Sequence, residues 1–216
     1  MSTNQPPSGT PAGDQNQVLQ PSSGQPSEAG DAGRVCLLTW HKAGSQWVRD
    51  LLTQRLALQQ SGVQNSGITY NLLPVGQDVL GPWPEIPLGT FAGPIYLAGP
   101  EEWRQQSRPQ DKAVVVLRDP RDLVVSMMYS VAVSHVQSIS TDRQRSALLA
   151  LPMSHRLLAC LPKFRRAAAF ADWGSLGWGR HENVFVTSYE RLVADTTQEL
   201  TAIYEFLGWQ IPAAMI

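Results

Sequence analysis

The sequence has 216 residues, 43% of them hydrophobic, and a formal net charge of -1 at pH 7. This length and composition suit one α/β domain with a sizeable core. The near-zero charge argues against binding to nucleic acid or to a membrane surface through bulk positive charge, so any anion site must be local. We expect neither nucleic acid nor membrane as a partner.

The N-terminus has no basic and then apolar signal-peptide pattern, and no apolar run reaches the roughly 18 residues that span a bilayer. The two cysteines, Cys36 and Cys160, are far apart, and Cys36 lies in an apolar run, which favours buried thiols over a disulfide framework or a metal site. The four histidines also lack metal-ligand spacing. We therefore expect a cytoplasmic protein without a metal.

The chain begins with a segment of Pro, Gly, Ser, Gln and Asn over residues 1–33. Such a segment buries too little apolar surface to offset its ordering entropy, which predicts a disordered tail followed by one domain over 34–216. That domain opens with "RVCLLT", typical of a buried strand. Ser45 is then predicted to cap a helix with Trp47, Val48, Leu51 and Leu52 on one face.

The rest of the domain alternates between predicted strands and helices. Residues 61–94 are rich in Gly and Pro and predict a long irregular connection. Asp119 and Pro120 follow a strand as cap and first residue of a helix, and Gly208 is predicted to end the last helix. The other expected elements are a short strand at 94–99, strands at 113–117 and 183–188, and helices at 143–150, 154–172 and 196–207.

This alternation predicts a mainly parallel sheet with right-handed crossovers. In such a sheet, ligands bind beyond the carboxyl ends of the strands. Two basic turns fall at those ends, one at Lys42 and one at Arg118. Two anion sites on one sheet suit a ligand with phosphate at both ends, such as a nucleoside with a 5'-linked anhydride and a 3'-phosphate.

The first turn, "HKAG", precedes the helix that starts near Ser45. Free N–H groups and the positive end of the helix dipole would point into this loop. Gly44 would allow an anion close to the backbone, Lys42 would add a charge, and Ser45 and Gln46 would donate hydrogen bonds. The alternative is an ordinary turn with an exposed lysine.

The second turn is "LRDPRD", and Ser126 follows it within the apolar stretch "LVVSMM". Arg118 could form a bidentate contact with a phosphate while Ser126 donates a hydrogen bond to the same group. Alternatively, the Ser126 hydroxyl bonds back to a carbonyl of its own helix. For Arg121 we favour a plain surface charge.

Three segments resemble motifs of the cytosolic-type sulfotransferases. "TWHKAGSQWVRDLL" resembles the 5'-phosphosulfate loop, Tyr-Pro-Lys-Ser-Gly-Thr-Thr-Trp-Leu. "VVVLRDPRDLVVSMMYS" resembles the 3'-phosphate motif, in which a serine follows the first arginine by eight positions. "VFVTSYERLVADTTQELTAIYEFLG" is similar to the strand, Tyr-Glu-Asp-Leu and helix that follow. The three motifs occur in family order between Arg34 and Gly208.

The resemblance implies a P-loop NTPase-like three-layer α/β/α sandwich with a mainly parallel sheet. It also implies transfer of a sulfuryl group from 3'-phosphoadenosine 5'-phosphosulfate (PAPS) to a hydroxyl or amine of a small-molecule or glycan acceptor, without a metal. Lys42 matches the lysine that stabilises the departing 5'-phosphate. The implied PAPS-binding residues are Lys42, Ala43, Gly44, Ser45, Gln46, Trp47, Arg118, Ser126 and Tyr189.

Two of these roles have alternatives. Trp47 matches the tryptophan that stacks on adenine, but a tryptophan here could equally pack its helix onto the sheet. Tyr189 matches a tyrosine near the adenine, although an aromatic residue after a strand could also belong to the core.

The sequence departs from the family pattern in three ways. His41 replaces a proline, and Gln46 a threonine. The histidine that many members use as base has no counterpart, because "IYLAGP" stands in that stretch; Glu101, Glu102, Tyr96 and His41 are open alternatives. The Arg-Lys-Gly…Gly-Asp-Trp segment that closes over the 3'-phosphate does not follow Phe-Leu-Gly, so we expect a truncated or frameshifted product, a partner that supplies the segment, or lost activity.

Two other functions compete with sulfuryl transfer. One is a non-catalytic or degenerate family member that binds only a nucleotide or a partner. The other is a P-loop kinase or ATPase in which "AVVVLRD" serves as a Walker-B strand ending at Asp119. Against the latter, no Gly-x4-Gly-Lys-Ser/Thr occurs, and Asp119 suits a helix cap.

Overall fold

The computed structural model describes residues 32–73, 80–134, 139–164, 178 and 181–212. Of the predicted tail at 1–33, residues 1–31 lie outside these ranges. Part of the predicted helix at 154–172 also lies outside them, because residues 165–177 are not described.

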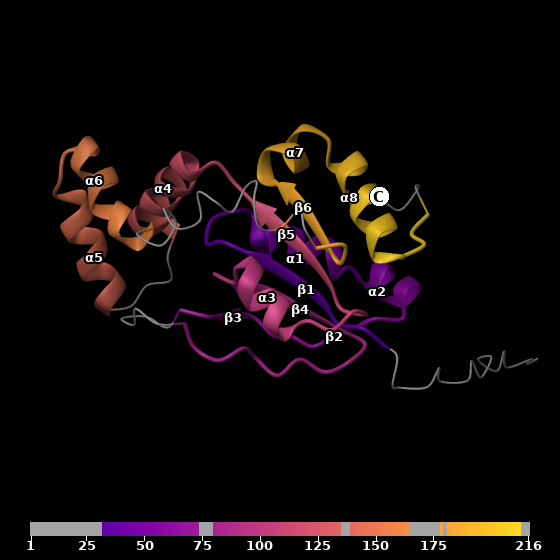
Figure 1. Cartoon of the computed structure of the whole chain (residues 1–216). Coiled ribbons are helices and arrows are strands. Elements are labelled where there is room, and N and C mark those ends of the chain that lie inside the picture. Colours follow the sequence, from indigo (N-terminus) through magenta and orange to yellow (C-terminus); the bar gives the residue numbers. More distant parts are fainter. Residues whose placement is uncertain (1–31, 74–79, 135–138, 165–177, 179–180, 213–216) are drawn as a thin grey trace, which may run out of the picture.

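A parallel sheet forms the centre of the molecule (Figure 1). Its strands have the order β2-β4-β1-β5-β6, and β3 also pairs with β4; all of these pairings are parallel. The strands are β1 (Val35–Thr39), β2 (Gln64–Asn65), β3 (Tyr70–Asn71), β4 (Thr90–Tyr96), β5 (Lys112–Leu117) and β6 (Val184–Ser188).

Helices alternate with the strands as predicted, although the helices at 55–61, 100–106 and 189–194 were not among the expected elements. The helices are α1 (Ser45–Leu52), α2 (Arg55–Ser61), α3 (Pro100–Gln106), α4 (Pro120–Tyr129), α5 (Ile139–Leu149), α6 (Met153–Cys160), α7 (Tyr189–Ala194) and α8 (Thr196–Leu207). A π-helical turn, η1 (Ser130–Ser134), extends α4, and a 3₁₀ turn, η2 (Leu161–Phe164), extends α6. Helices α4, α5 and α6 lie together at one end of the molecule in Figure 1.

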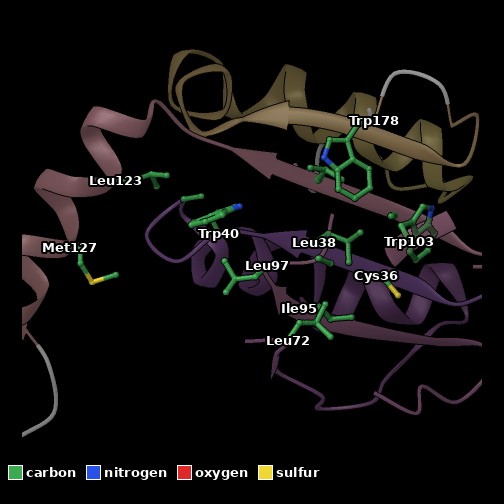
Figure 2. Packing of buried hydrophobic residues seen from close by; sticks show 14 of the residues in the cluster. Cys36, Leu38, Trp40, Leu72, Ile95, Leu97, Trp103, Leu123, Met127 and Trp178 are labelled. Atoms are coloured by element: carbon green, nitrogen blue, oxygen red, sulfur yellow. The ribbon is translucent and has the colours of Figure 1, made fainter. Parts of the chain in front are cut away.

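Each face of the sheet is covered by a separate apolar cluster. Successive β1 side chains alternate between them, as the period of two in a strand requires: Cys36 and Leu38 belong to one cluster, Val35 and Leu37 to the other. The first cluster includes Trp103 of α3 and residues of α4, and Figure 2 shows Trp40 at its end toward α4. The second includes residues of α1, α2 and α8. The predicted three-layer α/β/α arrangement with a mainly parallel sheet is confirmed.

Several predictions at the residue level are also confirmed. Both cysteines are buried, neither forms a disulfide, and burial raises the pKa of the Cys36 thiol to about 12. Asp119 caps α4, accepting a hydrogen bond from the Arg121 N–H at 2.8 Å. Gly208 ends α8 in the left-handed conformation at φ 78°.

Two predictions are wrong. Gly44, rather than Ser45, is the N-cap of α1, because its φ of 81° turns the chain and leaves Ser45 as the first helical residue. The irregular connection predicted at 61–94 contains β2, β3 and most of β4. The β4 residues that fall within this predicted connection, 90–94, are buried despite their Gly and Pro content. No helix in the described part of the chain is both long and apolar enough to cross a membrane.

Candidate functional site

The carboxyl ends of four strands lie level with one another. Thr39 at the end of β1 pairs with Tyr96 of β4 and with Val116 of β5, and Leu117 of β5 pairs with Ser188 of β6. The segments that follow these strands therefore meet at one edge of the sheet. This edge is where an open parallel sheet binds its ligands.

A cavity of about 700 Å³ opens at this edge. This volume lies within the range of ligand pockets in proteins, roughly 300–1,000 Å³. Its described lining contains two cations and no carboxylate, which suits an anionic ligand. The lining residues are His41, Lys42, Gly44, Ser45, Gln46, Trp47, Asn71, Tyr96, Arg118, Ser126, Met127 and Tyr189.

The turn between β1 and α1 uses two left-handed residues. Lys42 has a φ of 73° and Gly44 a φ of 81°. Left-handed backbone is strained for a residue with a Cβ, which is one reason for a glycine at position 44. The second reason is steric, because a side chain there would collide with a neighbour. A Cβ added there would lie 2.6 Å from Cδ2 of Tyr189. The glycine therefore allows β6 and α7 to approach the turn closely.

Lys42 extends its side chain toward α4. Its Nζ donates to Oγ of Ser130, the first residue of η1, at 3.0 Å. Partial burial, and to a smaller extent the charge of Arg118, lower the pKa of the Lys42 ammonium from its usual range. An ammonium with reduced hydration interacts more strongly with an anion than one in open water does.

Arg118 joins the second basic turn to the first. Its Nη1 donates to the Lys42 carbonyl oxygen at 2.9 Å, and its guanidinium lies 4.2 Å from the centre of the Tyr189 ring. Its Nε is buried and has no hydrogen-bond partner among the described residues. A buried donor without a partner is costly, so this group has remaining capacity to bind a ligand oxygen.

Polar groups at the start of α1 converge on Tyr96. Gln46 Nε2 donates to the Tyr96 hydroxyl at 2.8 Å, and Ser45 Oγ lies 3.2 Å from the same oxygen. The ring of His41 stacks on the Tyr96 ring, with centroids 4.0 Å apart and planes inclined by 17°. The Tyr96 side chain thus connects β4 with the turn at His41 and with the start of α1.

Two aromatic residues, Trp47 of α1 and Tyr189 of α7, line the cavity side by side. The rings of Trp47 and Tyr189 meet edge to face, with centroids 6.2 Å apart. Trp47 is partly buried and packs on the cluster beneath α1, while still lining the cavity. The packing alternative for Trp47 is thus confirmed, and its contact with adenine stays a prediction.

The cavity brings together eight of the nine residues for which the sequence predicts ligand binding. The exception is Ala43, whose side chain is fully buried and whose N–H donates to the Trp40 carbonyl at 3.3 Å. Arg121 is exposed and pairs with Asp119, as expected of a surface charge.

Two carboxylates that the sequence offers as bases have structural partners and do not line the cavity. Glu101 pairs with Arg104 on the exposed face of α3, and that pairing lowers its pKa to about 2. Glu102 accepts a hydrogen bond from the Gly99 N–H at 2.9 Å and so caps α3.

Three functional candidates were missed from the sequence: Asn71, Met127 and Ser130. A signal existed for Ser130, because it follows Ser126 by four residues, a spacing that places both on one face of a predicted helix. Asn71 offered none, since its position depends on the pairing of β3 with Tyr96 of β4. Within the described ranges, no group of three or more His, Cys, Asp or Glu residues could hold a metal ion.

A family model described as "Sulfotransferase domain" matches residues 103–214, just over half of the chain. This segment contains Arg118, Ser126 and Tyr189 but not the turn at Lys42. A search of curated proteins gave no match.

Solved structures similar to this chain include mouse sulfotransferase SULT7A1 complexed with PAP and retinol dehydratase complexed with PAP and either androsterone or retinol. Each is 15% identical to this chain, with a TM-score of 0.43. The matches cover 83%, 84% and 83% of this chain, but only 60%, 61% and 61% of the respective solved chains.

Proposed function

Because the chain belongs to the sulfotransferase domain family, we propose that it transfers a sulfuryl group from PAPS to a hydroxyl or amine of an acceptor. One observation carries this proposal: both basic turns line a single cavity and are joined by the hydrogen bond from Arg118 Nη1 to the Lys42 carbonyl. A nucleotide with phosphate at both ends would engage both turns at once.

The 5' end of the donor is assigned to the turn before α1. Gly44, Ser45 and Gln46 stand at the start of the helix, where N–H groups and polar side chains favour a phosphate. Lys42 lies beside them and would face the phosphate oxygen on which charge develops as the sulfuryl group leaves. The hydrogen bond from Lys42 Nζ to Ser130 Oγ, at 3.0 Å, orients the ammonium in this structure.

The 3' end is assigned to Arg118 and Ser126. The guanidinium has a buried Nε without a partner in the described part of the chain, and Tyr189 supports its flat face. A forked contact from Arg118 to phosphate is geometrically specific in a way that a lysine contact is not. The adenine would lie against Trp47 and Tyr189, which meet edge to face nearby.

The acceptor is proposed to be a small molecule or a glycan. Similar structures were solved with retinol and with androsterone, each with PAP. Of the remaining cavity wall, Met127 is apolar, whereas Asn71 and Tyr96 supply polar groups. Such a mixture suits an acceptor with an apolar body and a reactive hydroxyl.

The proposal is tested by calorimetric titration with PAP, the 3'-phosphoadenosine 5'-phosphate product, beside ATP with magnesium. We expect micromolar binding of PAP and much weaker binding of ATP. Arg118→Ala should reduce the PAP affinity about tenfold or more, because a hydrogen bond to a charged group contributes about 1.5–3 kcal/mol.

The matched control is Arg121→Ala, which removes an arginine of the same turn whose side chain is 89% exposed and bound to Asp119. It should leave PAP affinity unchanged. Preferred binding of ATP would favour a P-loop kinase or ATPase, and binding of PAP without sulfuryl transfer would favour a non-catalytic member. Equal losses in both variants would argue against the 3'-phosphate site at Arg118.

A further inference from the structure

The proposed transfer needs a group that takes the proton of the acceptor, and a general base must lie within hydrogen-bond reach of it. This inference rests on the proposed function. Among the described lining residues, His41 is the one histidine, the side-chain type that most often serves as a general acid or base in catalysis. Tyr96, the other neutral candidate, already uses its hydroxyl in contacts with Gln46 Nε2 and Ser45 Oγ.

The position of His41 is set by Tyr96. The two rings are stacked with centroids 4.0 Å apart, and the Tyr96 hydroxyl is held by Gln46 Nε2 and lies 3.2 Å from Ser45 Oγ. The imidazole therefore lies beside the start of α1, at the end of the cavity assigned to the 5'-phosphosulfate. A base for this reaction has to be at that end, because the attacked sulfur is there.

Charged and titratable groups near the imidazole include Tyr96, which is stacked on it; Lys42, its neighbour in the chain; and Arg118, which contacts the Lys42 main chain. The carboxylates of α3 are directed elsewhere: Glu101 binds Arg104, and Glu102 binds the Gly99 N–H. The described cavity wall thus offers an imidazole and no carboxylate as a proton acceptor.

We infer that His41 is the general base and that Tyr96 is the positioning residue that holds its ring. The acceptor oxygen forms a bond to sulfur while its proton passes to an imidazole nitrogen. The bond between sulfur and the bridging oxygen breaks, and its electron pair stays on the 5'-phosphate oxygen facing Lys42. The proton is later released from the imidazolium to water.

The test compares wild type with His41→Gln, using ³⁵S-labelled PAPS and phenols of graded acidity as acceptors, from 4-nitrophenol to 4-methylphenol. General-base catalysis contributes about 10²–10⁴-fold, so kcat for the least acidic phenol should fall at least about 100-fold. The loss should shrink for 4-nitrophenol, which ionises without help. A purely structural defect would lower kcat equally for all of them.

Three further readouts separate a base from a packing residue. In a profile of kcat against pH, the fall of wild-type kcat at low pH (the acidic limb) should vanish in His41→Gln and persist in Tyr96→Phe. Added imidazole should partly restore the kcat of His41→Ala. PAP should shift imidazole resonances that His41→Gln removes from the NMR spectrum. The matched control His155→Gln alters an exposed histidine of α6 and should change neither activity nor PAP binding.

The outcomes distinguish this inference from the proposed function. A wild-type protein that fails to bind PAP, or that binds it and transfers nothing to any acceptor, overturns the proposed function and the inference with it. Transfer that His41→Gln leaves intact, with its acidic limb unchanged, overturns the inference alone. Loss of that limb in Tyr96→Phe but not in His41→Gln would assign the base to Tyr96 instead.

Discussion

At the residue scale, Asp111, which directly precedes β5, is a buried ionised group outside the cavity lining. Its carboxylate is fully buried and accepts hydrogen bonds from the main-chain N–H groups of Arg34 and Arg108, each at 2.8 Å, and from both guanidinium groups. Burial alone would raise the pKa of this carboxyl, but the hydrogen bonds from Arg34 and Arg108 hold it well below its usual range.

Asp111→Asn is therefore expected to destabilise the fold by about 3–5 kcal/mol, the cost of breaking a buried ion pair by removing one partner. The wild-type contribution is present above the unfolded-state pKa of about 3.9 and is lost as pH falls toward the lower folded-state pKa. Denaturant unfolding between pH 7 and pH 3 should thus show a smaller pH dependence in Asp111→Asn than in wild type.

Glu101→Gln is the control for this prediction, since it removes an ion pair in which both side chains are more than half exposed. Such pairs are screened by solvent, and the unfolding midpoint at pH 7 should not change measurably. An Asp111→Asn protein as stable as wild type would show that the arginine pair contributes little. PAP affinity should be unaffected in both variants, because both sites lie outside the cavity.

At the element scale, the sequence predicted the elements with clear periodicity, missed β2 and β3, and placed the start of β4 four residues too late. β1, β5 and β6 are near-continuous apolar runs, and α4 and α8 carry their own start or stop residues, so local chemistry was enough. The first part of β4 ends at Gly93 within a Gly- and Pro-rich stretch that is typical of a loop. A Cβ at Gly93 would lie 2.6 Å from the Leu37 Cβ, so the glycine is needed for the close pairing of β4 with β1, which only the assembled sheet reveals.

Part of the candidate site was likewise predictable from the sequence, and part was not. Lys42, Ser45 and Arg118 were predicted because each stands within a few residues of a recognisable strand end. The stacking of His41 on Tyr96 was not predictable, since it depends on the register of two strands, β1 and β4, that are separated by 50 residues of chain. The sequence left four bases open, and two of them, Glu101 and Glu102, turn out to have partners within or next to α3.

Helix α3 gives the prediction that belongs to this scale. Glu102→Ala removes the side chain that accepts from the Gly99 N–H, and loss of an N-terminal cap costs about 0.5–2 kcal/mol. We expect lower stability in denaturant unfolding and unchanged kcat for sulfuryl transfer. A kcat reduced 100-fold with little change in stability would instead make Glu102 the base.

At the scale of the whole molecule, the cavity joins the ends of β1, β4, β5 and β6 with the start of α1, so a ligand that bridges them stabilises only the assembled fold. A ligand that binds the native state alone adds about 2.7 kcal/mol at a concentration of 100 Kd. For a chain of this size that corresponds to a rise in Tm of roughly 5–10 °C. We expect PAP without magnesium to produce this rise in thermal unfolding monitored by circular dichroism. Arg121→Ala should keep it, and Arg118→Ala should lose most of it at the same PAP concentration. An equal rise with ATP would mean that the fold recognises a nucleotide without reading its 3'-phosphate, and the Arg118 end of the cavity would then need another ligand.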